Sequence, residues 1–172
     1  MEFKNIVLIG MPSSGKSTIG KPLSKELNMQ FIDTDSLIFE REKRALKDIV
    51  NEDGLERFLQ IQEDTILEID AENHVISTGG SVVYNARAME HLKKDGFVVF
   101  LDVKLEEINN RLKSGRRFAR NPNQSFEDLY KERLPLYRKY ADITIDCSNK
   151  SVELLVKEIK DRFLAVSKGI NL

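Results

Sequence analysis

The 172-residue chain has little of the chemistry that crosslinks or metal clusters need: a single cysteine, Cys147, and two histidines, His74 and His91. One cysteine cannot form an internal disulfide, and these scattered residues lack the spacing of a metal-ligand cluster. A reactive-thiol function for Cys147 is disfavoured because nothing nearby pairs it with a base. A chain of this length can instead bury a sizeable core, so we expect one domain spanning residues 1–172.

The chain also lacks an excess of charge of either sign, with 27 basic and 28 acidic residues interspersed along it. This balance gives no electrostatic footprint for duplex nucleic acid or an anionic membrane. Apolar runs are only a few residues long, and the N-terminal residues show no signal-peptide pattern. We therefore expect a cytoplasmic protein, monomeric, whose partners are small molecules rather than nucleic acid or membrane.

The clearest pattern present is Gly-Met-Pro-Ser-Ser-Gly-Lys-Ser-Thr at residues 10–18. An apolar run at 6–9 precedes it and a helical stretch from about 17 to 27 follows, which is the context of a phosphate-binding loop rather than of a chance glycine-serine turn. Glycines at both ends let the backbone wrap closely around a polyphosphate, and Lys16 supplies a charge for the β- and γ-phosphates. Ser17 offers a hydroxyl ligand for Mg²⁺. The nucleotide-binding residues expected here are Gly10, Ser13, Ser14, Gly15, Lys16, Ser17 and Thr18.

The rest of the chain alternates between short apolar runs and amphipathic helical stretches. A helical pattern at 36–69 carries a plausible break at Asp53-Gly54, and the last helix has an apolar face at Leu154, Leu155, Ile159 and Phe163. Five strands alternating with helices predict a parallel sheet with helices on both faces. Beyond the first run, the predicted strands are 29–32, which we interpret as buried, 74–77, 97–101 and 143–146, and the later helices are 86–94, 105–112, 126–140 and 151–166.

Two carboxylates follow the second predicted strand at its carboxyl end, where open α/β sheets bind ligands. Asp33 could approach Mg²⁺, and Asp35 could orient an acceptor hydroxyl or take its proton. The other interpretation is an Asx turn in which Asp35 caps the next helix. The turn Thr78-Gly79-Gly80-Ser81, directly after another strand, could present N–H groups to an anion.

Arginines supply candidate phosphate and carboxylate ligands. The arginine-rich stretch 114–125 lacks a sustained apolar period and is predicted to be a mobile lid, from which Arg116, Arg117 or Arg120 could close over the transferring phosphate. Arg133 lies in a mostly apolar helix, where an arginine usually either snorkels or binds an anion.

Taken together, these blocks and their order resemble the shikimate kinase family of phosphate-loop kinases over nearly the whole chain. The resemblance implies a three-layer α/β/α fold with strand order 2-3-1-4-5, ATP and Mg²⁺, and amino-acid biosynthesis. It also implies Lys16, Asp35 and Arg117 as catalytic residues, with Arg117 as the best-matching lid arginine, Ser17 and Asp33 at the metal and Arg111 against the adenine, with the segment 146–151 near the base. Around the acceptor it implies Asp35, Gly79, Gly80 and Arg133.

The chain departs from the family pattern on the acceptor side. Leu59 stands where the family's substrate-binding arginine is expected, Gln62 stands in place of its acidic neighbour, and Ser81 replaces the third glycine of the turn. We expect Leu59 and Ser81 to line the acceptor pocket. Shikimate, which the resemblance implies, is the default acceptor. The alternative is another small hydroxy acid or a hydroxy-amino acid such as homoserine, which would need only one anion clamp. A nucleotide-binding regulatory protein without a small acceptor is a third possibility, which negligible ATP turnover with every acceptor would favour.

Overall fold

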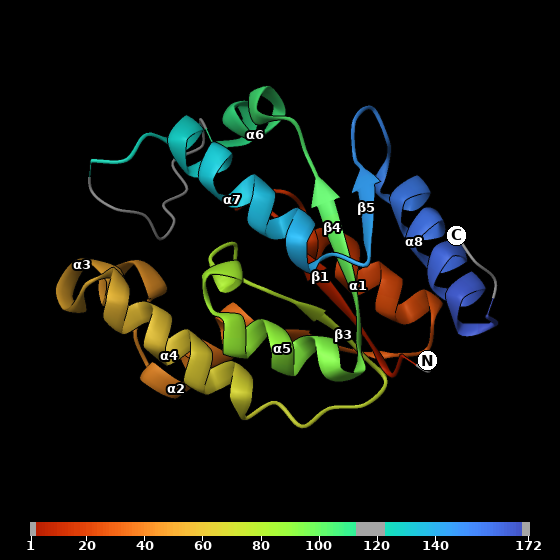
Figure 1. The fold of residues 1–172 in the computed structure, drawn as a ribbon, viewed down its shortest axis with the longest axis horizontal. Coiled ribbons are helices and arrows are strands. Elements are labelled where there is room, and N and C mark those ends of the chain that lie inside the picture. The colour runs from red at the N-terminus through yellow and green to blue at the C-terminus, as the bar shows by residue number, and fades with distance from the viewer. Residues whose placement is uncertain (1–2, 113–122, 170–172) are drawn as a thin grey trace.

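A parallel five-stranded sheet forms the centre of the computed structural model, which describes residues 3–112 and 123–169 (Figure 1). In this part of the chain the strand order is β2-β3-β1-β4-β5, which confirms the predicted order. The edge strand β2 has half-buried and exposed side chains, so the prediction that this strand is buried was wrong. The strands are β1 (Asn5–Ile9), β2 (Gln30–Asp33), β3 (His74–Ser77), β4 (Gly96–Asp102) and β5 (Ile143–Asp146).

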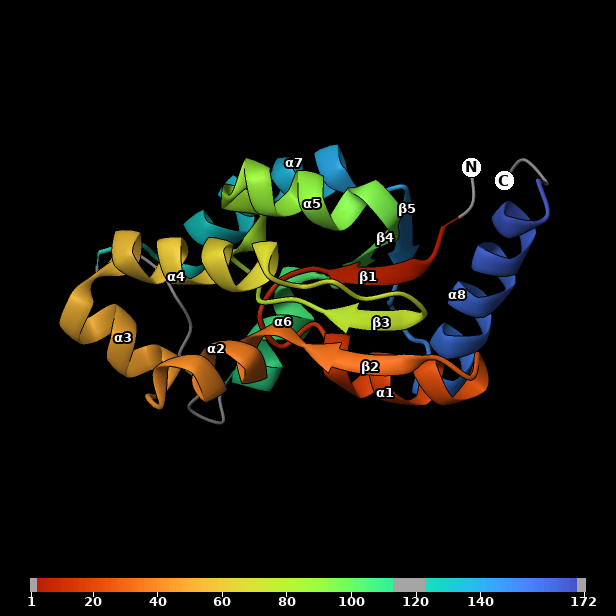
Figure 2. The ribbon, with the colours of Figure 1, turned by 90° about the horizontal axis from the view of Figure 1, so that it is seen from below.

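Helices cover both faces of the sheet, as the alternating pattern predicts (Figure 2). On one face α1 (Lys16–Glu26) packs with α8 (Val152–Ser167), and on the other lie α5 (Ala86–Asp95) and α7 (Phe126–Tyr140). Three of the buried residues of α8 follow the spacing i, i+4, i+8, namely Leu155, Ile159 and Phe163, and Val156 is buried beside them. Leu154 stays 49% exposed, so its assignment to the inward face was wrong.

The segment predicted as one interrupted helix forms three helices: α2 (Thr34–Glu42), α3 (Leu46–Asp53) and α4 (Leu55–Leu67). The break at Gly54 was predicted, and its φ of 88° favours glycine. The break before α3 was not, because Lys43 adopts a left-handed φ of 54° without a glycine or proline to signal it. Ile38, Ile49, Phe58 and Ile61 give these helices a small core of their own, separate from the main one. Figure 2 places this helical unit beyond the carboxyl ends of the strands.

Two short elements complete the described fold. The helix α6 (Leu105–Leu112) was predicted from the sequence pattern, whereas the 3₁₀ turn η1 (Val82–Tyr84) was not. Within the described ranges, no helix combines the length and apolar character needed to cross a bilayer. Most of the predicted lid, namely residues 114–122 of 114–125, lies outside the described residues. At its other end, the Ser125 hydroxyl accepts a hydrogen bond from the Asp128 N–H and caps α7.

Candidate active site

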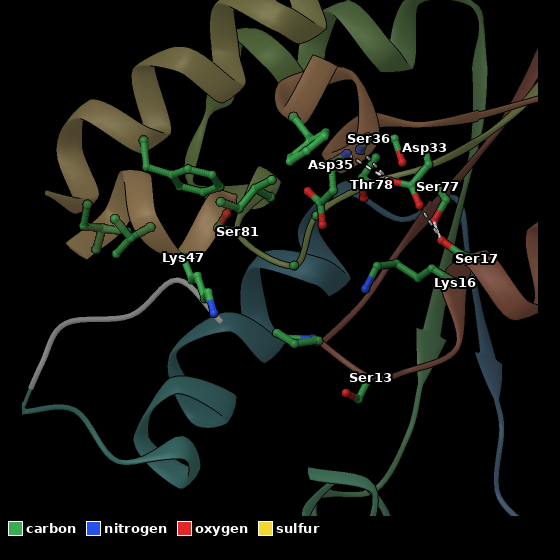
Figure 3. A pocket seen from close by; sticks show the side chains of 18 of the residues that line it. Ser13, Lys16, Ser17, Asp33, Asp35, Ser36, Lys47, Ser77, Thr78 and Ser81 are labelled. Atoms are coloured by element: carbon green, nitrogen blue, oxygen red, sulfur yellow. Dashed lines mark hydrogen bonds between the residues drawn. The ribbon is translucent and has the colours of Figure 1, made fainter. Parts of the chain in front are cut away.

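A cavity of about 1280 Å³ opens at the carboxyl ends of β1, β2 and β3, between the phosphate loop and the α2–α4 unit. Such an edge is where parallel sheets bind ligands, because loops and helix N-termini converge there. In Figure 3, Asp35 and Lys16 point into this cavity from different sides. The predicted site residues that line it are Ser13, Gly15, Lys16, Ser17, Thr18, Asp33, Asp35, Gly79, Gly80, Ser81 and Arg133.

The loop at residues 10–18 wraps around the ammonium group of Lys16. Lys16 Nζ donates hydrogen bonds to the carbonyl oxygens of Gly10 and Met11, each at 2.8 Å, and to Ser14 Oγ at 3.4 Å. Gly15 caps α1 with a φ of 93°, a left-handed conformation that side chains rarely adopt. The result is a buried cation beside a helix N-terminus, the arrangement that holds phosphate oxygens.

Ser17 and Asp33 bring two hard oxygen ligands together. Ser17 Oγ donates to Asp33 Oδ2 at 2.8 Å and lies 3.1 Å from Ser77 Oγ. Adjacent ligands of an octahedral Mg²⁺ stand about 3 Å apart, because each lies about 2.1 Å from the metal. Within the described residues no cluster of three His, Cys, Asp or Glu side chains exists, and Mg²⁺ bound to phosphates needs only one or two protein ligands. These residues therefore fit Mg²⁺.

Asp33, the last residue of β2, and Asp35, in the first turn of α2, have different structural roles. Asp33 Oδ1 accepts hydrogen bonds from the N–H groups of Asp35 and Ser36, at 3.0 and 3.3 Å, and so caps α2. The alternative with Asp35 as the cap was wrong. The Asp35 carboxylate instead points into the cavity beside Gly79, where an added Cβ would come within 2.6 Å of Oδ1. Any side chain at Gly79 would therefore displace this carboxylate.

Arg133 comes from α7 and is only 1% exposed. Its Nε donates to the Tyr84 hydroxyl at 3.2 Å, and the guanidinium lies 5.1 Å from the centre of the Tyr84 ring. The guanidinium also reaches Gly80, where an added Cβ would stand 3.1 Å from Nη1 and 2.7 Å from Pro12 Cδ. Tyr137 donates to the Gly80 carbonyl at 2.6 Å, and burial raises the pKa of Tyr137 far above its ordinary value, so it stays a neutral donor. Asp35 and Arg133 thus flank two adjacent glycines.

Helix α4 presents no charge at the two positions where the family pattern has one. Leu59 is half-buried against the small core of the α2–α4 unit, while Leu55 and Phe58 line the cavity. Gln62 is fully buried, and its Oε1 accepts from Ser81 Oγ at 3.2 Å and from Asn85 Nδ2 at 3.5 Å. The structure therefore places Leu59 beside the cavity wall rather than in it.

A second cavity of about 450 Å³ lies on the other side of the phosphate loop. Arg111 lines it and donates from Nη1 to the Ser13 carbonyl at 2.9 Å. Cys147, from the start of the 146–151 segment, also lines it, as do Ser14 and Thr18. This brings together the residues expected at the nucleotide base. Arg116, Arg117 and Arg120 lie outside the described residues.

Sequence reasoning missed the face that α3 presents to the main cavity. Lys47, Val50 and Asn51 line it with the spacing i, i+3, i+4, which places them on one side of the helix. The signal was present in the spacing, but only the break at Lys43 separates α3 from α2 and turns this face toward the cavity. Leu46 and Phe39 extend the same wall.

The sequence model of the family described as shikimate kinase matches residues 12–164. The chain belongs to the shikimate kinase family. A shikimate kinase of Clostridium botulinum (strain Loch Maree / Type A3) is 42% identical over 164 residues, covering 91% of this chain and 95% of that protein. A shikimate kinase of Sulfurihydrogenibium sp. (strain YO3AOP1) is 40% identical over 159 residues, with the same coverage. The match therefore extends well beyond the phosphate loop.

Solved structures agree with this assignment. Shikimate kinase from Acinetobacter baumannii in complex with shikimate has a TM-score of 0.87 at 29% identity, covering 95% of this chain and 94% of that chain. Shikimate kinase from Aquifex aeolicus has a TM-score of 0.81 at 33% identity, covering 95% of this chain and 98% of the other. A gluconokinase from Sinorhizobium meliloti 1021, at 14% identity and a TM-score of 0.60, shares the fold alone.

Proposed function

We propose that this protein transfers the γ-phosphoryl group of ATP to a hydroxyl of shikimate, forming shikimate 3-phosphate. The observation that carries the proposal is the position of Asp35 and Arg133, which flank Gly79 and Gly80 in the cavity that also holds Lys16. A small acid lying between them would place a hydroxyl at the carboxylate and its own carboxylate at the guanidinium. Relatives named shikimate kinase at about 40% identity support this acceptor.

Each group has a part in the transfer. Lys16 holds the phosphates by charge, and Asp35 orients the acceptor hydroxyl and takes its proton. Ser17 and Asp33 would hold Mg²⁺, which supplies neutralisation of the phosphate charge when bound. Arg133 fixes the acceptor by a charge-assisted contact, so that its hydroxyl is held in line with the phosphate. A lid contribution from Arg117 and action as a cytoplasmic monomer stay predictions from the sequence.

Kinase assays with a panel of acceptors test the proposal. ADP release should depend on ATP, Mg²⁺ and shikimate together, and mass spectrometry should find one phosphate on the shikimate product. More efficient turnover of another acceptor than of shikimate would overturn the proposal. Homoserine as the best substrate would favour the second candidate, which the uncharged positions 59 and 62 support. No turnover with any acceptor would favour a regulatory nucleotide-binding protein.

A further inference from the structure

Three cationic side chains line the main cavity within the described residues: Lys16, Arg133 and Lys47. The first belongs to the phosphate loop and is held there by two carbonyl oxygens. Arg133 is buried on the α7 side, against Tyr84. Lys47 stands apart from both, on α3, and neither the phosphate-loop pattern nor the family pattern accounts for it.

The direction of Lys47 is what distinguishes it from an ordinary surface lysine. Figure 3 shows its side chain extending from α3 into the cavity, on the side away from Ser17 and Asp33. The helical unit α2–α4 contributes apolar side chains to the same cavity, together with the polar Asn51 and Glu40; the apolar ones include Leu46, Val50, Leu55 and Phe58. Lys47 therefore adds an exposed cation to the α3 side of the cavity, away from Ser17 and Asp33.

Lys47 also has no counter-ion in the described part of the chain. The nearby basic residue Arg44 is engaged by Glu52 at 2.6 Å and Asp53 at 2.8 Å, whereas no ion pair or hydrogen bond involves the Lys47 ammonium there. Asp35 and Glu40 line the cavity too, and neither forms an ion pair with it. An ammonium group left without a partner in a binding cavity can hold an anion that arrives with the ligand.

The neighbouring helix α4 lacks the two charged residues that the family pattern has there, which gives a reason for a cation on α3. Leu59 and Gln62 leave these two positions of α4 without a charge, so among the described residues that the family pattern places at the acceptor, Arg133 alone would bind its carboxylate. We propose that Lys47 is the second cation for this carboxylate and binds it from the α3 side, across the cavity from Arg133. This inference rests on the proposed function and makes Lys47 a specificity-determining residue for anionic acceptors.

Steady-state kinetics of Lys47→Ala test the inference with two acceptors, shikimate and its neutral carboxamide. The KM for shikimate should rise about tenfold, as the loss of one charge-assisted contact predicts, while the KM for ATP and kcat change less than about twofold. With the carboxamide, the wild type and the variant should have equal KM values. Lys47→Arg should keep most of the affinity for shikimate. Lys25→Ala, which removes an exposed helical lysine away from both cavities, is the matched control and should change neither constant.

Two results would overturn the inference: an unchanged KM for shikimate in Lys47→Ala, or an equal rise for shikimate and the carboxamide. Calorimetric titration of shikimate in the presence of ADP separates this failure from that of the proposed function. Lys47-dependent binding without turnover would overturn the proposed function alone. Turnover that does not depend on Lys47 would overturn the inference alone, and no binding of shikimate to the wild type would overturn both.

Discussion

Asp33 and Asp35 lie two residues apart, and the local backbone conformation directs their carboxylates to different places in the site. Asp33 is extended and turns its carboxylate back toward the N-terminus of α2 and Ser17, where it serves both as a cap and as a potential metal ligand. Asp35 is already helical, and its carboxylate enters the cavity beside Gly79. A spacing of two residues therefore separates the carboxylate that we propose for the metal from the one that we propose for the acceptor.

Substitution of Lys16 by alanine should lower kcat by at least about a hundredfold, because it removes a fixed charge aimed at the phosphates. The fold should persist, since Lys16 borders the cavity and water can reach the vacated carbonyl oxygens of Gly10 and Met11. Coupled ADP release measures the first effect and thermal melting the second. Near-normal turnover in a folded variant would show that the loop is not catalytic.

Asp35→Asn keeps the size of the side chain and removes its ability to take a proton. We expect kcat to fall by roughly 10²- to 10⁴-fold, the usual contribution of a positioned general base. The dissociation constant of ADP should stay nearly unchanged, because Asp33 and Ser17, not Asp35, lie at the metal side. Pre-steady-state turnover and calorimetry measure the two quantities. A loss of nucleotide binding as large as the loss of kcat would instead place Asp35 at the metal.

At the scale of elements, the sequence was sufficient wherever a local pattern determines the structure. Helices 105–112 and 126–140 and strands 74–77 and 143–146 were predicted to the residue, and the strand order followed from the family resemblance. The break at Lys43 was missed, because a left-handed lysine leaves no signal in the sequence. Without that break, the face of α3 and Lys47 could not be placed in the cavity. The position of the α3 face in the cavity thus depends on tertiary contacts, whereas the phosphate loop could be predicted from its local sequence pattern.

Variants of α4 test how charged residues at positions 59 and 62 would affect the stability of the protein. Gln62→Glu alone should lower the free energy of unfolding by about 2–4 kcal/mol, because it buries a carboxylate near that of Asp35. Adding Leu59→Arg, one helical turn away, should restore at least half of this loss, as urea unfolding would show. Leu59→Ala with Gln62→Glu is the control, since it adds no cation.

The same double variant tests the acceptor side. If the new arginine reaches the carboxylate, shikimate should bind about tenfold more tightly, and the gain should be largest in a Lys47→Ala background, where a cation is missing. Fluorescence or calorimetric titration measures this affinity. No gain in either background would mean that position 59 does not reach the acceptor, in keeping with the position of Leu59 beside the cavity wall.

At the scale of the whole molecule, the phosphate loop separates two cavities. Ser13, Gly15 and Thr18 line both, so one bound nucleotide can extend from one cavity into the other. Under the proposed function we expect the acceptor in the larger cavity, with Asp35 and Arg133, and the nucleotide base in the smaller one, with Arg111 and Cys147. Cys147, which has no role in the transfer, can therefore report on nucleotide binding.

The cysteine thiol should react slowly in the folded protein. Burial raises the pKa of Cys147 to about 12, and the side chain is 4% exposed, so little thiolate forms at pH 8 and the reagent has poor access. Alkylation by iodoacetamide should therefore be at least about a hundredfold slower than in urea, where the thiol has an ordinary pKa, and should speed up as the pH rises from 8 to 10.

Saturating ADP should slow this alkylation further, by at least about fivefold, because the nucleotide base would cover the sulfur and the bound nucleotide would stabilise the native state. Shikimate at an equal multiple of its dissociation constant provides the control, since ligand binding alone stabilises the native state by the same mass-action term. It should protect Cys147 much less than ADP does, because it occupies the cavity on the opposite side of the phosphate loop. Equal protection by both ligands would mean that the sulfur reacts only after global unfolding. Protection by shikimate alone would contradict the placement of the base beside Arg111 and Cys147.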